Sequence, residues 1–195
     1  MSRRNLIIGL VILAVLAFFV YKSRANRPLP AGRITTDIQI SPTPIVTPEP
    51  ITTRPRVQIS TSKGDFIIEL RPDLAPQSVV NFLTKWSNGY CNNLTFHRVE
   101  DWVVQGCDPA GNGTGGQMTL PTETSAASFT AGSVGVARLA YPTDKSNDSQ
   151  FFVVKKDSIF LNGEYTYLGK VVSGMSVVDR LAIGDQITDT TILTK

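Results

Sequence analysis

The central stretch FHRVEDWVVQGCDPAGNGTGG (residues 96–116) combines two short β-like runs with a glycine-rich turn. The runs LTFHRV and WVVQGCD mix β-branched and aromatic residues, a composition typical of strands. The segment GNGTGG satisfies the dinucleotide-binding pattern G-x-G-x-x-G, but QMTLPTE follows it and contains a proline where that motif needs a helix. We therefore expect a tight-turn loop here and no nucleotide site.

Similar short runs continue on both sides of this stretch. They are VQISTS, DFIIEL, SVGVARL, QFFVVKK, YTYLGKVV and the terminal ITDTTILTK. Lys63-Gly64 between the first two runs predicts a hairpin. Two helices are predicted, one that starts at Pro76 and stops at Asn88-Gly89, and one over SVVDRLAI (176–183). Many short strands with two helices favour a compact, mainly β barrel with helical caps.

Charge and rare residues exclude several classes of protein. The net charge is +3, and six basic residues precede the first acidic residue, Asp37, so residues 37–195 carry 3 − 6 = −3. This balance argues against a nucleic-acid partner. A single histidine, His97, argues against a zinc site and against a Ser-His-Asp hydrolase. We expect neither metal nor cofactor, and read His97 as a structural, hydrogen-bonded side chain.

Cys91 and Cys107 are the only cysteines, too few for a disulfide scaffold. Two buried thiols and one bridge both remain open, and we favour the thiols.

The first 55 residues predict two segments that precede the folded domain. Residues 6–21 are uncharged and almost wholly apolar, so residues 1–21 are expected to form a transmembrane signal anchor. A cleaved signal peptide is the alternative, but a basic cluster follows the run. Residues 22–55 hold seven of the 12 prolines and predict an extended Pro/Thr-rich linker. We expect a single-pass membrane protein with its domain outside the cytoplasm, although basic residues on both flanks leave the orientation open.

Seven motifs lie in one order along residues 56–195. They are FHRV (96–99), VQGCDP (104–109), GNGTGG (111–116), GSVGVAR (132–138), SQFF (149–152), FLNG (160–163) and LGKV (168–171). Together they resemble the signature of the cyclophilins. The resemblance implies an eight-stranded antiparallel barrel capped by two helices, a groove along one face, and peptidyl-prolyl cis/trans isomerase activity on proline-containing polypeptides. It also implies that the domain acts as a monomer.

The resemblance assigns site residues by position. Arg98, after Phe-His, takes the catalytic role, and Gln105 takes the role of hydrogen-bonding the substrate backbone. The remaining substrate-binding positions are Trp102, Val103, Ala137, Arg138, Gln150, Phe152, Phe160, Leu161 and Tyr165. The segment from Arg98 to Gln105 is one residue shorter than in the commonest form of the family. Arg138, Phe160 and Tyr165 are choices that resemble bacterial members.

Arginine suits the chemistry of bond rotation. Amide resonance creates a barrier of about 18–20 kcal/mol, and the twisted transition state localises a lone pair on the prolyl nitrogen. A fixed donor aimed at that nitrogen binds the twisted form better than either planar form. Arginine is always charged and presents several donors. The second hypothesis is a binding module or tethered chaperone that recognises proline segments without turnover; loss of activity in Arg98→Ala distinguishes the two.

Overall fold

The computed structural model describes residues 53–193. The expected anchor (1–21) and nearly all of the expected linker (22–55) lie outside the described residues. Within residues 53–193, no helix is both long enough and apolar enough to cross a membrane. The first strand begins at Arg56.

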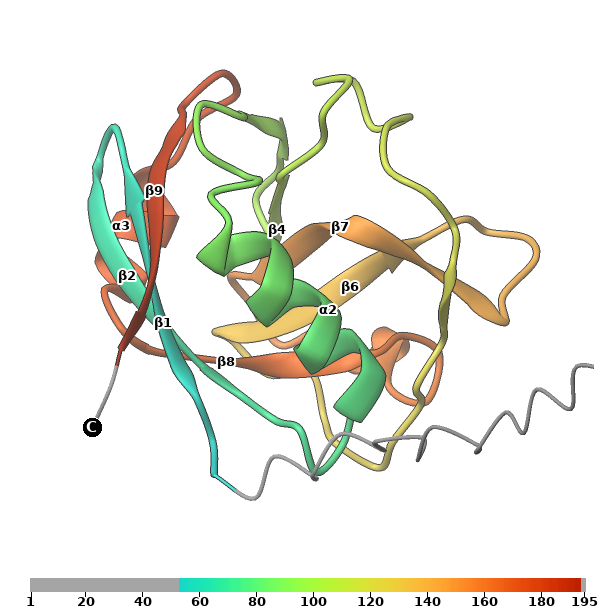
Figure 1. Cartoon of the computed structure of the whole chain (residues 1–195). Coiled ribbons are helices and arrows are strands. Elements are labelled where there is room, and N and C mark those ends of the chain that lie inside the picture. The colour runs from blue at the N-terminus through green and yellow to red at the C-terminus, as the bar shows by residue number, and fades with distance from the viewer. Residues whose placement is uncertain (1–52, 194–195) are drawn as a thin grey trace, which may run out of the picture. The chain divides into compact units, whose positions relative to one another are not determined.

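Short antiparallel strands dominate the described chain (Figure 1). The strands are β1 (Arg56–Thr61), β2 (Gly64–Leu70), β3 (Phe96–Val99), β4 (Val103–Gly106), β5 (Leu120–Pro121), β6 (Ser133–Arg138), β7 (Lys145–Val154), β8 (Tyr167–Ser173) and β9 (Ile187–Leu193). The helices are α2 (Pro76–Ser87), α3 (Met175–Arg180) and the 3₁₀ turn η1 (Ile159–Leu161).

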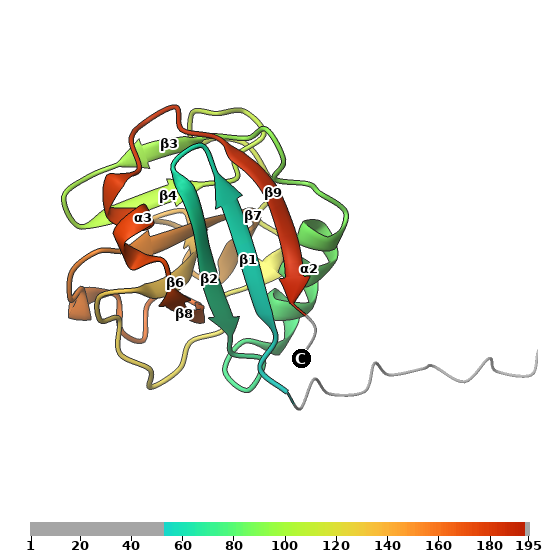
Figure 2. The same cartoon turned by 90° about the vertical axis from the view of Figure 1, so that its left-hand side faces the viewer.

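Eight of these strands form one curled antiparallel sheet in the order β3-β4-β7-β6-β8-β2-β1-β9. The two-residue β5, which the sequence did not predict, pairs with β7 beside this path. Figure 2 shows β2, β1 and β9 side by side, in line with their pairing. The edge strands β3 and β9 approach each other at a single bridge between Thr95 and Gln186. The eight expected strands and the two expected helices are therefore confirmed.

Local sequence explains the individual elements. Gly64 has φ 116°, which a residue without a side chain adopts readily, and it closes the hairpin opposite Thr61. Helix α2 begins at Pro76, where the missing N–H costs nothing, and Glu123 accepts the next two backbone N–H groups, from Gln77 and Ser78. Helix α3 is shorter than predicted and ends at Arg180, because the next residue already has extended backbone.

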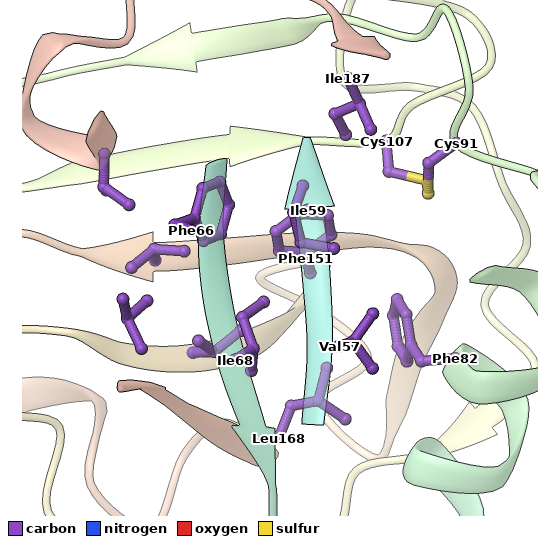
Figure 3. Close-up of a cluster of buried hydrophobic side chains, with 14 of the residues drawn as sticks. Val57, Ile59, Phe66, Ile68, Phe82, Cys91, Cys107, Phe151, Leu168 and Ile187 are labelled. Carbon is purple, nitrogen blue, oxygen red and sulfur yellow. A yellow bond between two sulfur atoms is a disulfide. The ribbon is translucent and has the colours of Figure 1, made fainter. Parts of the chain in front are cut away.

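Two hydrophobic clusters lie on opposite faces of the sheet. The larger one, shown in Figure 3, includes Ile59, Phe66 and Phe151 and is covered by α2 through Phe82 and Trp86. The smaller one contains Val103, Phe129, Phe152, Val154, Leu161 and Tyr167. Neighbouring side chains of a strand point to opposite faces, so Phe151 belongs to the first cluster and Phe152 to the second. The smaller cluster forms the floor of the candidate site.

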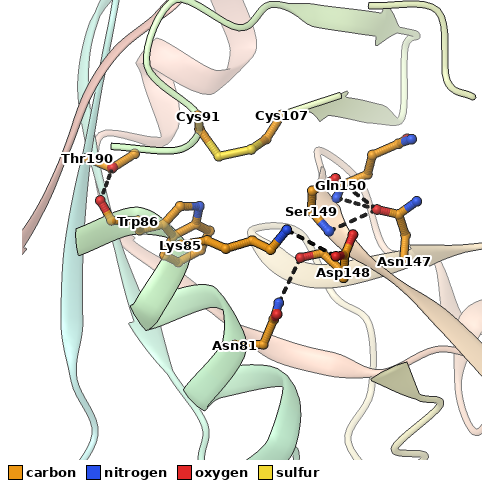
Figure 4. Close-up of a disulfide and its surroundings, with 10 residues drawn as sticks. All are labelled: Asn81, Lys85, Trp86, Cys91, Cys107, Asn147, Asp148, Ser149, Gln150 and Thr190. Atoms are coloured by element: carbon orange, nitrogen blue, oxygen red, sulfur yellow. Dashed lines mark hydrogen bonds and ion pairs between the residues drawn. A yellow bond between two sulfur atoms is a disulfide. The ribbon is translucent and has the colours of Figure 1, made fainter. Parts of the chain in front are cut away.

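The expectation of two free thiols was wrong. Cys91 and Cys107 form a disulfide with a Cα–Cα distance of 5.1 Å and lie in the larger cluster (Figure 4). Helix α2 is held against β7 by Lys85, whose ammonium lies 3.0 Å from a carboxylate oxygen of Asp148, and β7 also pairs with β4. This docking brings Cys91, just after the helix, to Cys107, just after β4. A cysteine count cannot reveal such proximity.

Candidate active site

A pocket on the face of the smaller cluster collects nine of the eleven residues predicted for the site. They are Arg98, Trp102, Val103, Gln105, Ala137, Arg138, Phe152, Leu161 and Tyr165. The residues come from β3, β4, β6, β7, η1 and the segments beside them. Only the folded sheet brings residues 98 and 165 to one pocket.

Strand register places the central residues next to one another. Arg98 of β3 lies opposite Gln105 of β4, which lies opposite Phe152 of β7. Side chains directly opposite each other on adjacent strands share one face of the sheet. On the far side of Phe152 lies Gly135 of β6, where a Cβ would collide with the Phe152 ring. Gly135 therefore leaves the space in which the Phe152 ring lies.

Arg98 is held at the pocket edge by three neighbours. Its Nε donates to Glu100 Oε1 at 2.6 Å, and its Nη1 donates to Gln105 Oε1 at 3.4 Å. Its guanidinium carbon lies 5.4 Å from the centre of the Trp102 ring, within range of a cation–π contact. The side chain is 42% exposed, so the guanidinium remains accessible to a substrate.

The walls of the pocket are apolar and aromatic. Val103, Phe152 and Leu161 are each at least 95% buried. Phe152 packs edge-on against Tyr165, with ring centres 5.7 Å apart. Such walls fit a compact apolar ring such as that of proline, which has no N–H to satisfy.

Arg138 forms the opposite side of the pocket and is fixed by hydrogen bonds. Its Nε donates to the Glu164 carbonyl at 2.8 Å, its Nη1 to the Leu139 carbonyl at 2.8 Å, and its Nη2 to Glu164 Oε2 at 3.1 Å. Its guanidinium carbon lies 4.4 Å from the Tyr165 ring centre. Arg138 thus supports the Tyr165 wall.

Two predicted substrate-binding residues do not line the pocket. Gln150 is only 1% exposed; its Oε1 accepts Gln105 Nε2 at 2.8 Å, and its Nε2 donates to the carbonyls of Gly113 and Gly115. It lies behind Gln105 and orients that amide. Phe160 is 65% exposed and packs against Trp102, with ring centres 5.2 Å apart, so it extends the apolar surface next to the pocket.

Sequence reasoning missed Glu100, Gly135 and Glu164. The position of Glu100, two residues after Arg98 and so on the same side of an extended chain, is a signal that could have found it. Gly135 and Glu164 gave no such signal, since their importance depends on neighbours from other strands.

The glycine-rich segment is a loop, as expected, and Asp108 organises it. This buried carboxylate accepts the backbone N–H groups of Ala110, Asn112 and Gly113 at 2.6–3.2 Å. Burial acts to raise the pKa of Asp108, but these hydrogen bonds and the nearby His97 outweigh it and lower the pKa. The loop in turn supplies the carbonyls that hold Gln150.

His97 does not match its predicted structural role in full. Among the described residues, neither of its ring nitrogens has a hydrogen-bond partner. Burial, and to a lesser degree the charge of Arg98, lower the pKa of His97 although Asp108 acts to raise it. The ring is therefore neutral at neutral pH. No group of three or more His, Cys, Asp or Glu side chains within residues 53–193 is arranged to hold a metal ion.

The curled antiparallel sheet and the apolar pocket with an arginine at its edge agree with the expected resemblance to the cyclophilins. The family model for cyclophilin type peptidyl-prolyl cis-trans isomerase/CLD matches residues 56–194. The chain belongs to this family, and it is a peptidyl-prolyl cis-trans isomerase.

Curated relatives agree with this assignment. A probable peptidyl-prolyl cis-trans isomerase of Brucella suis is 40% identical over 144 residues, which is 67% of this chain and 72% of the relative. The peptidyl-prolyl cis-trans isomerase ppi1 of Schizosaccharomyces pombe is 36% identical over 132 residues, 65% of this chain and 84% of that protein.

A solved structure has the same fold. The crystal structure of a cyclophilin type peptidyl-prolyl cis-trans isomerase of Cryptosporidium parvum matches with a TM-score of 0.67 and 28% identity, covering 73% of this chain and 99% of that one. That protein was also crystallised in the presence of the dipeptide Ala-Pro, and this second structure matches with a TM-score of 0.66.

Proposed function

We propose that Arg98 is the catalytic residue of this isomerase and that the pocket beside it binds the proline ring of a polypeptide substrate. The observation that carries the proposal is that the partly exposed side chain of Arg98 lies at the edge of an apolar pocket. The Cryptosporidium parvum cyclophilin was crystallised in the presence of the dipeptide Ala-Pro, which contains the kind of X-Pro bond proposed as the substrate here.

The geometry supports a direct role for the guanidinium. The Arg98 Nε–H donates to Glu100 and an N–H of Nη1 donates to Gln105, and within residues 53–193 no acceptor takes an N–H of Nη2. A donor held at the pocket edge can reach the prolyl nitrogen when the bond twists and the lone pair localises there. This contact exists only in the twisted state and so lowers the barrier. A thousandfold acceleration needs about 4 kcal/mol, within reach of one charge-assisted hydrogen bond in a dry pocket.

The remaining residues are proposed to hold the substrate while one end rotates. The apolar walls Val103, Phe152, Leu161 and Tyr165 would hold the proline ring. Gln105 would hydrogen-bond the substrate backbone, with its amide oriented by Gln150. Trp102 and Phe160 would extend the apolar contact along the chain.

Substitution of Arg98 tests this assignment. We expect Arg98→Ala to lower kcat/KM for a proline peptide by about 10²–10³-fold, the usual effect of removing one transition-state donor. Arg56→Ala is the matched control, because Arg56 is also a strand arginine paired with a glutamate but lies outside the pocket. Exchange rates measured by NMR need no coupled protease. Equal rates in wild type and Arg98→Ala would refute the role of Arg98.

We further propose that the isomerase domain is tethered to a membrane by residues 1–21 and lies outside the cytoplasm, where it assists folding of exported or membrane proteins. The apolar run and the Pro-rich segment support the tether. The Cys91–Cys107 disulfide supports the location, because disulfides persist in oxidising compartments and are rare in the cytosol. Protease added to intact cells or spheroplasts should remove the domain; full protection in both would refute the location.

A further inference from the structure

The turn between β3 and β4 contains a glutamate that contacts two pocket residues at once. Glu100 Oε1 accepts the Nε–H of Arg98 at 2.6 Å, and Glu100 Oε2 accepts the indole N–H of Trp102 at 2.8 Å. Both donors line the pocket, but Glu100 does not. Each carboxylate oxygen of Glu100 therefore accepts a hydrogen bond from one pocket-lining residue, while Glu100 itself lies outside the pocket.

The short turn explains this position. Only three residues separate Val99, which ends β3, from Val103, which starts β4. The Glu100 N–H donates to the Val103 carbonyl at 2.8 Å and closes the turn. Because the chain reverses so tightly, Trp102 returns beside Arg98, and the carboxylate of Glu100 lies between the two side chains.

Neighbouring contacts anchor the backbone of the turn without using Glu100. The Lys155 N–H donates to the Trp102 carbonyl at 2.7 Å, and the Lys156 ammonium lies 2.8 Å from Asp101 Oδ2. The turn thus has backbone and side-chain links to the end of β7. Removing the Glu100 carboxylate leaves these links in place.

We infer that Glu100 is a positioning residue for the isomerase reaction, which orients the guanidinium of Arg98 toward the substrate and fixes Trp102 as a wall of the pocket. This inference rests on the proposed role of Arg98.

Two oxygens on different sides fix the guanidinium. Glu100 accepts the Nε–H of Arg98, and Gln105 Oε1 accepts an N–H of Nη1. The orientation of the guanidinium is therefore set by an outer acceptor, Glu100, which does not line the pocket, and an inner acceptor, Gln105, which does. The inner acceptor is itself fixed by the buried Gln150. The outer acceptor is Glu100 alone among the described residues. A long, 42% exposed side chain needs such a restraint, since misplacing a catalytic group by about 1 Å can lower the rate by about 10²-fold.

Glu100 is a carboxylate at neutral pH. The hydrogen bond from Arg98 is the largest influence and lowers the pKa of Glu100; burial acts to raise the pKa, and the hydrogen bond from Trp102 lowers it further, so the net shift is downward. An ionised acceptor gives the shorter, charge-assisted bond to Arg98.

An ordinary surface ion pair makes a different prediction from a positioning residue. Exposed pairs contribute little to stability and have no reason to affect turnover. If Glu100 positions Arg98, its loss lowers kcat and leaves the melting temperature almost unchanged. If it is only a surface pair, kcat is unchanged.

The test compares two neighbouring carboxylates in the full-length chain. We expect Glu100→Ala to lower kcat about tenfold with KM changed no more than about twofold to threefold, because orientation is lost while most of the pocket remains. Glu100→Gln keeps an oxygen that can accept the Arg98 Nε–H and should recover part of the loss. Asp101→Asn is the matched control, since Asp101 lies in the same turn but pairs with Lys156; it should match wild type.

An NMR signature separates positioning from a general disturbance. In Glu100→Ala, the Nε–H signal of Arg98 and the indole N–H signal of Trp102 should both move. The indole N–H of Trp86, fully buried in the other cluster, should not move and serves as internal reference. Wild-type kcat in Glu100→Ala, equal losses in Asp101→Asn, or unmoved Arg98 and Trp102 signals would each overturn the inference.

The double variant Arg98→Ala/Glu100→Ala distinguishes this inference from the proposed catalytic role. If the effect of Glu100 on kcat passes through Arg98, kcat of the double variant is no lower than that of Arg98→Ala alone, and a loss through Trp102 is limited to a further rise in KM. If Arg98→Ala is inactive but Glu100→Ala has full activity, only the inference about Glu100 fails. If Arg98→Ala has full activity, the proposed role of Arg98 fails as well.

Discussion

The Cys91–Cys107 bridge allows a quantitative prediction about stability. The two cysteines are 16 residues apart in sequence. For a loop of this length, the loop-entropy relation predicts that the bridge lowers the entropy of the unfolded chain by about 10 cal/mol/K. This raises the free energy of the unfolded chain by about 3 kcal/mol at 25 °C. For a domain of this size, 1 kcal/mol corresponds to roughly 2–4 °C in melting temperature. Breaking the bridge should therefore lower the melting temperature by roughly 6–12 °C.

Circular dichroism on oxidised and reduced protein measures this difference. The reduced wild type keeps both sulfur atoms in the core, so it isolates the effect of the link from the effect of lost packing. The variant Cys91→Ala/Cys107→Ala should melt at or below the temperature of the reduced protein, because both positions are fully buried and the smaller side chains leave voids.

Activity at 25 °C should change by less than about twofold on reduction, because a stability loss of about 3 kcal/mol leaves most domains folded. Gln105, two residues before Cys107, is also held by pairing with β7 and by Gln150. Equal melting temperatures for oxidised and reduced protein would refute the reasoning. They would also remove the support that the bridge gives to an extracytoplasmic location.

Two further predictions concern the pocket floor and the glycine-rich loop. Gly135→Ala places a Cβ against the Phe152 ring, so thermal melting should show that the free energy of unfolding falls by about 1–3 kcal/mol. Kinetics with a proline peptide should show a raised KM. If the stability and KM both stay unchanged, Gly135 does not have this role. Asp108 has a lowered pKa in the folded state, so its stabilising contribution is complete above its unfolded pKa of about 4 and is lost as pH falls through the lower folded pKa. Urea titrations between pH 2 and 6 should therefore show that the free energy of unfolding falls less steeply with decreasing pH in Asp108→Asn than in wild type. The two slopes should differ by at most about 1.4 kcal/mol per pH unit. Identical slopes would show that Asp108 does not contribute.

Local patterns in the sequence predicted the elements well where each element depends on its own residues. Pro76 and the spacing of Val79, Phe82 and Trp86 predicted α2, and Lys63-Gly64 predicted the hairpin of β1 and β2. The second helix was predicted too long, because periodicity continues through Leu181 while the backbone becomes extended there. Strand β5 has two residues and exists only through pairing with β7, so no run of residues could indicate it.

The order of motifs in residues 96–171 determined the family, the pocket and the place of Arg98, since each motif occupies a fixed position in the fold. Tertiary structure decided everything that depends on distance between strands. Gln150, which was predicted to line the groove, is buried behind Gln105 in the structure. Cys91 and Cys107, whose pairing the composition could not decide, form a disulfide. The tertiary structure also placed Glu100 between Arg98 and Trp102. Sequence specifies which groups are present and how they alternate along a strand, whereas contacts across strands arise only when register and helix docking bring distant residues together.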